Sequence, residues 1–354
     1  MSQFLAERYR KLEAYVPGEQ PRDMEYIKLN TNESPFPPAP SVVDIVDSHQ
    51  VELLRLYSDP TCIRLRTKLG ELYGLKAENV FVTNGSDDSL NFIFMAYGHM
   101  GAMFPNITYG FYKVYAELHQ VDYTEIAMED DFTIDINKYK GWGQLMVIAN
   151  PNAPTGICLE VNEIRQILDN NPKSVVVIDE AYVDFGGESC YPLITEYPNL
   201  LVVRTYSKSR NLAGGRLGYV LGNKELIADL EKLKYSTNPY CINRLTLLLG
   251  EATVDANNYY VGCCKEIERV RQHTTDKLVA MGFDVLPSKA NFVFAKNNAW
   301  DGKELYLALK KKGVLVRHFE KKKISQYLRI TIGTQEQMDE FIKRLQEILD
   351  GGDK

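Results

Sequence analysis

Lys208 stands between two serines in the stretch TYSKSRNLAGGRLGYV (residues 205–220), and Arg216 follows it eight residues later. A lysine on the surface needs no particular neighbours. A lysine that lies near other cations and is partly removed from water has a lowered pKa, and its neutral amine can attack a carbonyl to form a Schiff base. Ser207 and Arg216 offer hydrogen-bond donors to a phosphate, which an arginine fork fits well. The stretch therefore predicts a nucleophilic lysine beside an anion site.

A second candidate is Asp179, which follows the apolar run VVVI (175–178) and should therefore be buried. A buried carboxylate needs a partner. One interpretation is a structural salt bridge or a helix cap. The other is a carboxylate that stabilises a bound cation, and this segment alone leaves both open.

Two further loops follow apolar runs and carry polar residues. The loop NPNAPTG (150–156) holds two prolines and a glycine, so it is either a plain turn or a rigid loop that aims Asn152. After VFVT (80–83), Gly85 permits an unusual turn, and a helix begins near Ser86 whose free amides could hold a phosphate. The alternative for this helix start is an ordinary cap.

Short apolar runs rich in β-branched residues must position these groups. They alternate with helical patterns at 86–98, 110–119 and 160–170, which favours an α/β fold with a mostly parallel sheet. We expect strands at 80–83, 102–104, 122–126, 145–149, 175–178, 200–204 and 217–221. Because ligands bind beyond the carboxyl ends of such strands, the polar residues there should share one crevice.

The pattern changes after about residue 222. A long helical stretch begins near 223 and is expected to continue past Pro239, as far as about residue 250. Strands at 291–296, 314–319 and 327–333, with helices at 302–312 and from 335, then predict an α+β unit. We expect a large domain over 30–222 and a smaller α+β domain made of both chain ends, 1–29 and 251–354.

Composition restricts the class of protein. The 354 residues carry a net charge of −6 with no long basic run, which gives little support to nucleic-acid binding. The six cysteines form no CxxC pair and no zinc-type cluster, so reduced thiols in the cytoplasm are the simplest interpretation. The start of the chain lacks the apolar core of a signal peptide, and no apolar run is long enough to span a membrane.

One cofactor needs the polar groups at the strand ends together. Pyridoxal 5′-phosphate requires a lysine for its aldehyde, an acid for its pyridinium nitrogen and donors for its phosphate. Lys208, Asp179, Ser207 and Arg216 match these three requirements.

The motifs NPNAPTG, DEAY and SKSRNLAGGRLGY, in that order, resemble those of the fold-type I pyridoxal-phosphate enzymes in their class II aminotransferase branch. The spacing agrees, with 27 residues from Asn152 to Asp179 and 29 from Asp179 to Lys208. With LNTNESP (29–35) and YLRITIGT (327–334), the chain looks most like the histidinol-phosphate aminotransferases of that branch. The resemblance runs over nearly the whole chain and implies an α/β large domain with a seven-stranded sheet.

The resemblance also implies roles at the cofactor. Lys208 would form the Schiff base and move a proton between the substrate Cα and the cofactor, and Asp179 would pair with the pyridinium nitrogen. Tyr57 would reach the phosphate in a neighbouring subunit, which implies a homodimer with shared sites. The other cofactor contacts would come from the ring neighbours Asn152, Tyr182 and Tyr109 and from the phosphate neighbours Ser86, Asp87, Thr205, Ser207 and Arg216.

At the substrate, the resemblance implies that Arg329 grips an anionic group and that Tyr15, Asn32 and Arg317 line the same pocket. Tyr57 and Tyr109 could instead be packing residues, and Arg317 could be a surface strand residue. Arg329 is better supported, since an arginine inside an apolar strand needs an anion.

The activity implied is the transamination of L-histidinol phosphate with 2-oxoglutarate, which gives imidazole-acetol phosphate and L-glutamate. Threonine-phosphate decarboxylation and aromatic-amino-acid transamination are alternatives within the same fold. A cofactor-binding regulator is a further alternative, which would need an appended DNA-binding domain. The chain contains no GxGxxG after a strand, so a nicotinamide dehydrogenase is not favoured.

Overall fold

The computed structural model describes residues 2–141 and 143–351. A seven-stranded sheet dominates it, in the order β2-β8-β7-β6-β5-β3-β4. Only β8 runs antiparallel to its neighbours, so the predicted mostly parallel sheet is confirmed. The strands are β2 (Val80–Thr83), β3 (Ala102–Pro105), β4 (Tyr123–Ile126), β5 (Leu145–Ala149), β6 (Val176–Asp179), β7 (Leu200–Thr205) and β8 (Gly218–Gly222).

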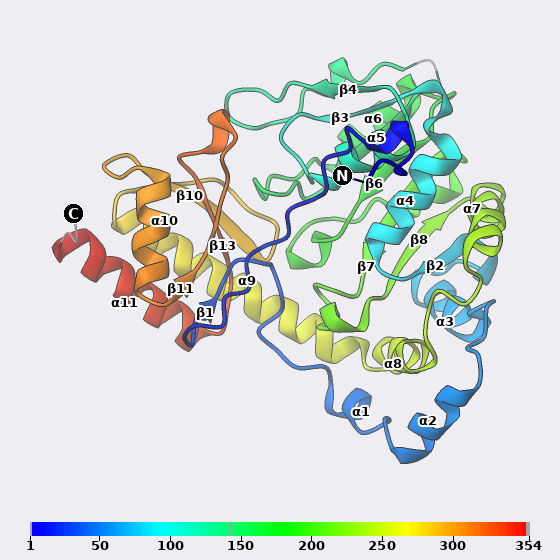
Figure 1. Ribbon diagram of the computed structural model, residues 1–354, viewed down its shortest axis with the longest axis horizontal. Coiled ribbons are helices and arrows are strands. Elements are labelled where there is room, and N and C mark those ends of the chain that lie inside the picture. The colour runs from blue at the N-terminus through cyan, green and yellow to red at the C-terminus, as the bar shows by residue number, and fades with distance from the viewer. Residues whose placement is uncertain (1, 142, 352–354) are drawn as a thin grey trace.

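Helices cover both faces of this sheet (Figure 1). Side chains alternate between the faces of a strand, and β5 shows the result. Leu145 and Val147 lie in the apolar cluster with helices α4, α5 and α7, whereas Met146 and Ile148 lie in the cluster with α3 and α6. This is why the strands read as unbroken apolar runs. The helices are α3 (Ile63–Tyr73), α4 (Ser86–Tyr97), α5 (Phe111–Leu118), α6 (Val161–Asn170) and α7 (Lys224–Thr237).

A second, four-stranded antiparallel sheet has the order β12-β13-β10-β9. Its own apolar cluster joins it to the long helix α9 and to α10 and α11. Figure 1 shows this unit on the left, with the C-terminal helix at its outer side. The elements are α9 (Asn257–Ala280), β9 (Phe283–Val285), β10 (Phe292–Asn297), α10 (Gly302–Lys311), β12 (Arg317–His318), β13 (Leu328–Thr331) and α11 (Gln335–Gly351).

Two predictions for this half were wrong. The helical stretch from 223 does not continue past Pro239: α7 ends at Thr237, and α8 (Arg244–Asp255) starts anew. Proline lacks the amide that a helix needs, and it disfavours helical backbone in the residue before it, Asn238. The predicted strand at 314–319 is two short strands, since β11 (Val314–Leu315) pairs with β1 (Ile27–Lys28) while β12 joins the four-stranded sheet.

The N-terminal segment crosses the molecule between the two sheets (Figure 1). Its strand β1 runs parallel to β11, and two short helices, α1 (Pro40–Val43) and α2 (Ser48–Glu52), then lie at the lower edge. The division into 30–222 and the two chain ends stays a prediction, and residues 1 and 352–354 of those ends lie outside the described residues. All six cysteines are free. No helix in the described part of the chain is both long and apolar enough to cross a bilayer.

Candidate active site

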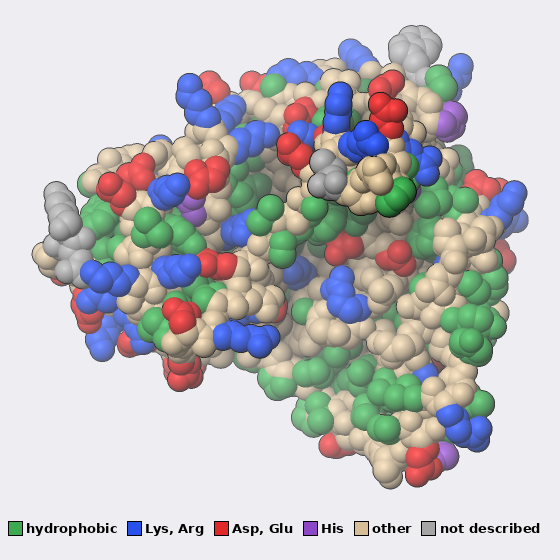
Figure 2. Space-filling view, viewed as in Figure 1, with side chains coloured by type: hydrophobic (Ala, Val, Ile, Leu, Met, Phe, Trp, Pro, Cys, Tyr) green, Lys and Arg blue, Asp and Glu red, His purple; other side chains and the backbone are tan. Residues whose placement is uncertain are grey.

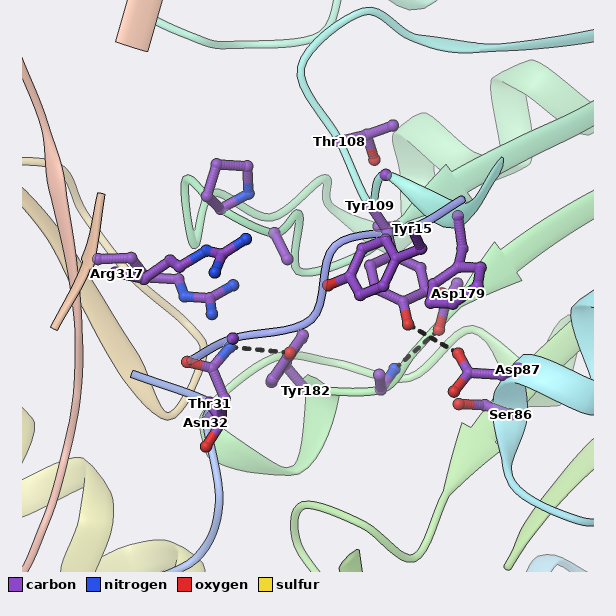
Figure 3. Close-up of a pocket in the computed structure, with 18 of the residues that line it drawn as sticks. Tyr15, Thr31, Asn32, Ser86, Asp87, Thr108, Tyr109, Asp179, Tyr182 and Arg317 are labelled. Atoms are coloured by element: carbon purple, nitrogen blue, oxygen red, sulfur yellow. Dashed lines mark hydrogen bonds between the residues drawn. The ribbon is translucent and has the colours of Figure 1, made fainter. Parts of the chain in front are cut away.

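A cavity of about 890 Å³ opens between the seven-stranded sheet, the N-terminal segment and the four-stranded sheet. Figure 2 shows the molecule hollowed there, with acidic and basic side chains inside the hollow. Every predicted site residue lines this cavity except Asn152 and Tyr57. Figure 3 shows how three separate parts of the chain meet: Asn32 from the N-terminal segment, Asp87 from the start of α4 and Arg317 from the opposite side.

Lys208 follows β7, and its side chain lies between the two sheets. Its Nζ donates to the backbone oxygen of Thr31 at 3.2 Å and lies 5.8 Å from the centre of the Tyr182 ring. Burial lowers the pKa of Lys208 to about 8, and the positive charge of Arg329 adds to this effect. The neutral, nucleophilic form of this amine is therefore more populated near neutral pH than it is for an exposed lysine.

Asp179 ends β6 and is only 5% exposed. Its Oδ2 accepts a hydrogen bond from the Tyr112 hydroxyl at 2.7 Å, and its Oδ1 accepts from the Ala181 amide at 3.3 Å. Burial nevertheless raises the pKa of Asp179 to about 6. The carboxylate has neutral donors as partners, so a cation brought next to it would be strongly attracted.

A compact anion site lies at the start of α4. Gly85 there has a φ of 87°, and an added Cβ would approach the Arg216 side chain to 2.7 Å. Arg216 donates from Nη1 to Ser207 Oγ at 3.2 Å and pairs through Nη2 with the Asp87 carboxylate at 3.3 Å. The first amides of a helix have no acceptors within the helix, so Ser86 offers one beside this guanidinium.

Strand β8 approaches the same helix start closely. A Cβ on Gly218 would lie 2.4 Å from the Ser86 nitrogen, so only glycine fits. Thr205 and Ser207 complete the wall, and Thr205 Oγ1 accepts from the Ser207 amide at 3.1 Å. Backbone amides, hydroxyl groups and the guanidinium of Arg216, which is paired with Asp87, surround a small space, and these donors suit a phosphate.

Aromatic and amide side chains form the middle of the cavity. Tyr109 donates to Asp87 Oδ1 at 2.7 Å, and Asn32 Nδ2 donates to the Tyr182 hydroxyl at 2.9 Å (Figure 3). The Tyr15 ring stacks on Phe111, with 4.1 Å between their centres. The N-terminal segment therefore contributes directly to the cavity wall.

Two arginines lie at the far end, directly opposite each other on β12 and β13. Arg329 Nη2 donates to the Asn30 oxygen at 3.0 Å, while its buried Nε has no partner. Arg317 donates to the backbone oxygens of Pro17 and Val16 at 3.4 and 3.3 Å. Burial lowers the pKa of Arg329, so an anion in this place would be favourable.

Two predicted residues lie elsewhere. Asn152 is buried beside the cavity, where its Nδ2 donates to Ile107 and Thr155 and its Oδ1 has no partner. Tyr57 is 79% exposed and stacks on Tyr240, with 4.5 Å between the ring centres. Its predicted contact is with a neighbouring subunit, so a position outside the cavity of its own chain leaves that prediction untested.

Sequence reasoning missed Tyr112, Thr31 and Phe319. Tyr112 is fully buried on α5, and its ring meets that of Tyr109 edge to face, with 5.7 Å between the centres. Thr31 acts through its backbone oxygen, which no side-chain pattern reveals. Phe319 lines the far end of the cavity beside both arginines.

Comparisons with known proteins agree with this geometry. The family model for aminotransferase class I and II matches residues 24–345. A histidinol-phosphate aminotransferase from Brachyspira hyodysenteriae is 46% identical over 352 residues, which is 99% of each chain.

Solved structures share the fold. That of a histidinol-phosphate aminotransferase from Sinorhizobium meliloti in complex with pyridoxal-5′-phosphate has a TM-score of 0.82 at 22% identity, covering 92% of this chain and 91% of that one. An L-threonine-O-3-phosphate decarboxylase from Porphyromonas gingivalis has a TM-score of 0.78 at 21% identity, covering 91% and 99%. The fold thus holds more than one chemistry, whereas the family model and the close relative both extend over most of the chain. This chain belongs to the class I and II aminotransferases.

Proposed function

We propose that this chain transfers the amino group of L-histidinol phosphate to 2-oxoglutarate, giving imidazole-acetol phosphate and L-glutamate, with pyridoxal 5′-phosphate as cofactor. The observation that carries the proposal is one cavity with a lysine of lowered pKa and a buried acid at one end and, at the other, two arginines that have no carboxylate partner among the residues the structure describes. The relative at 46% identity bears the corresponding name. The predicted cytoplasmic location remains part of this proposal.

The residues present fit the cofactor. Asp179 is buried with a raised pKa and has no cationic partner within residues 2–141 and 143–351; a pyridinium nitrogen would supply one. The space bounded by Gly85, Gly218 and Arg216 has donors for a phosphate. Asn152, Tyr182 and Tyr109 would lie around the ring, and the unpaired Oδ1 of Asn152 shows that its amide has hydrogen-bonding capacity to spare.

Each residue of the site would then have its own role in binding the cofactor, moving the proton or orienting the substrate. When bound, pyridoxal 5′-phosphate supplies an aldehyde and an electron-withdrawing ring. Lys208 holds the aldehyde end, and its Nζ later takes the proton from the substrate Cα. Asp179 keeps the ring nitrogen protonated, since a carboxylate in this dry place favours a neighbouring cation. Arg329 and Arg317 hold the phosphate or carboxylate of the substrate and so orient its Cα toward Lys208.

A homodimer is the second part of the proposal. An exposed apolar patch surrounds α1 and α2 at the lower edge of the molecule (Figure 2), and such patches commonly mark interfaces. Tyr57 is the most exposed large apolar side chain in this patch, which is expected of a residue that reaches into a neighbouring subunit. The patch consists of Val43, Val46, Val51, Leu54, Leu56 and Tyr57.

The visible spectrum of the cofactor-loaded protein tests the reaction. Histidinol phosphate without a keto acid should remove the absorbance band of the loaded enzyme, and 2-oxoglutarate should restore it. A band that persists with histidinol phosphate would overturn the substrate assignment. Release of carbon dioxide from threonine phosphate would then identify the decarboxylase, and a response to aromatic amino acids would identify the third alternative.

Complementation tests the shared site. Chains carrying Lys208→Ala and chains carrying Tyr57→Ala should each have low activity, because each lacks one part of every site. Co-expression should recover activity, since a mixed dimer has one site with both residues. Failure to recover activity in a preparation that contains mixed dimers would contradict the contribution of Tyr57 across the interface.

A further inference from the structure

Phe319 directly follows β12, two residues after Arg317, and lines the cavity. The centre of its ring is 5.8 Å from the guanidinium carbon of Arg317 and 5.7 Å from that of Arg329. A cation within about 6 Å of an aromatic face is attracted to it. One ring therefore contacts both of the arginines at the far end of the cavity.

The two guanidinium groups need such support. Arg317 and Arg329 are register partners on adjacent antiparallel strands, and like charges directly opposite each other destabilise a sheet. Within the described residues, neither forms a salt bridge, and both donate hydrogen bonds to backbone oxygens, those of Val16, Pro17 and Asn30. These carbonyls compensate only part of the two positive charges.

The ring of Phe319 is itself held in place by aromatic packing. Its ring meets Phe294 edge to face, with 6.0 Å between centres and an interplanar angle of 77°. Phe294 is fully buried, is the register partner of Arg329 on β10, and stacks on Tyr327 at 4.7 Å. The rest of the Arg329 environment is also aromatic, since Phe292 lies 5.5 Å from its guanidinium carbon. The ring of Phe319 is thus held by a packed aromatic cluster while its face remains at the cavity.

We propose that Phe319 is a positioning residue that keeps the Arg317 and Arg329 guanidinium groups together as one receptor for a dianionic phosphate monoester, and that it thereby favours this ligand over a singly charged carboxylate. The inference rests on the proposed function and deepens it. A phosphate has enough oxygens and charge for two guanidinium groups, whereas a carboxylate is satisfied by one. Losing the ring would let the two cations separate, which affects the dianion more.

The kinetic test compares Phe319→Leu with Phe319→Tyr in the cofactor-loaded enzyme. Leucine removes the aromatic face, so KM for histidinol phosphate should rise roughly 3- to 30-fold, as expected for one or two lost cation–π contacts. KM for glutamate should change much less, because each of its two carboxylates is singly charged and is satisfied by one guanidinium. The value of kcat should stay within about twofold, and tyrosine should restore the original ratio of the two KM values. An equal rise for both substrates, or no rescue by tyrosine, would overturn the proposal.

Phe132→Leu is the matched control, because Phe132 meets Phe294 edge to face in the same cluster without contacting either arginine. It should lower the melting temperature and leave the ratio of the two KM values unchanged. A change in that ratio as large as the one from Phe319→Leu would show that the cluster as a whole is responsible, and would contradict the role of Phe319.

A binding measurement separates this inference from the proposed reaction. Calorimetry with inorganic phosphate and with acetate, at mildly alkaline pH and with the cofactor bound, needs no turnover. Phe319→Leu should weaken phosphate binding roughly 3- to 30-fold and leave acetate nearly unchanged. If histidinol phosphate is not a substrate but this difference in binding is seen, the inference about the phosphate receptor is supported and the proposed reaction is not. If the two anions are affected alike, the inference fails whatever the substrate is.

Discussion

The two ends of the cavity balance their charges in different ways. At the lysine end, which we define by Lys208, Asp179 and Arg216, two of the three charged groups have side-chain partners: Arg216 pairs with Asp87 at 3.3 Å, and Asp179 accepts from Tyr112 at 2.7 Å. Lys208 donates to the backbone oxygen of Thr31. At the arginine end, defined by Arg317, Arg329 and Phe319, the cations have backbone oxygens and aromatic faces instead.

This difference corresponds to how long a ligand stays. Charges that pair within the protein hold their geometry when the site is empty, which suits a group that remains bound through many turnovers. Cations without counter-charges keep their attraction for an incoming anion, which suits substrates that enter and leave. The lysine end is therefore organised for a resident cofactor and the arginine end for two alternating substrates.

The largest expected effect is at the lysine end. Lys208→Ala removes the amine that holds the cofactor and moves the proton, so the rate of the half-reaction should fall by about 10² to 10⁴ or more. Stopped-flow measurement of the half-reaction with histidinol phosphate checks this. Lys265→Ala is a suitable control, since Lys265 is an exposed lysine on α9. Near-normal turnover by Lys208→Ala would contradict the comparison, because the reaction would then not depend on the lysine end of the cavity.

At the arginine end, Arg329→Ala should act on binding more than on chemistry. Truncating one partner of a buried charged contact costs about 2–5 kcal/mol, so kcat/KM for histidinol phosphate should fall by about 30-fold or more. Steady-state kinetics with both amino donors is the measurement. Arg329→Lys keeps the charge but loses the fork, and should recover only part of the loss. A fall in kcat at unchanged KM would assign Arg329 to the reaction step and remove the contrast between the two ends.

Much of this arrangement could be predicted from the sequence. Asp179 and Lys208 each follow an apolar run, so their place at the strand ends follows from burial and sheet geometry. The helix break at Pro239 was also visible in the sequence, and the error lay in giving the helical pattern more weight than the proline. Tyr112 and Thr31 had no such signal, because one lies in an aromatic-rich helix and the other uses its backbone oxygen.

Asp179→Asn should raise the stability of the cofactor-free protein at neutral pH and lower the affinity of the protein for the cofactor. In the cofactor-free protein, the pKa of Asp179 is raised from 3.8 to about 6, so the folded state binds more protons than the unfolded state in that interval. The contribution of Asp179 to the free energy of unfolding therefore falls as the pH rises through this interval, by up to roughly 3 kcal/mol above pH 6. The cofactor-free Asn variant should thus melt higher than the parent above pH 6 and equally near pH 3.8.

With the cofactor present, the same substitution should weaken binding, because the pyridinium nitrogen loses its anion. Melting curves of both proteins from acid to neutral pH, with and without pyridoxal phosphate, test the two signs together. Asp184→Asn is a useful contrast, since Asp184 is paired with Arg204 and its pKa is lowered. That variant should be less stable than the parent at neutral pH. A destabilised cofactor-free Asp179→Asn at neutral pH would show that Asp179 has a counter-charge of its own.

Tyr112→Phe should have the smallest effect, and it tests how the lysine end keeps its acid in place. The variant retains the buried ring and removes one hydroxyl, so Asp179 Oδ2 loses the 2.7 Å hydrogen bond and the pKa of Asp179 should rise further. A hydrogen bond of this kind contributes about 1 kcal/mol, so cofactor affinity should fall about fivefold. The pH interval over which the stability difference between Asp179→Asn and its parent develops should also extend to higher pH when both carry Tyr112→Phe. If neither the cofactor affinity nor this pH interval changes, the sheet alone holds the Asp179 carboxylate in place. The side-chain partners at the lysine end would then not explain the contrast with the arginine end.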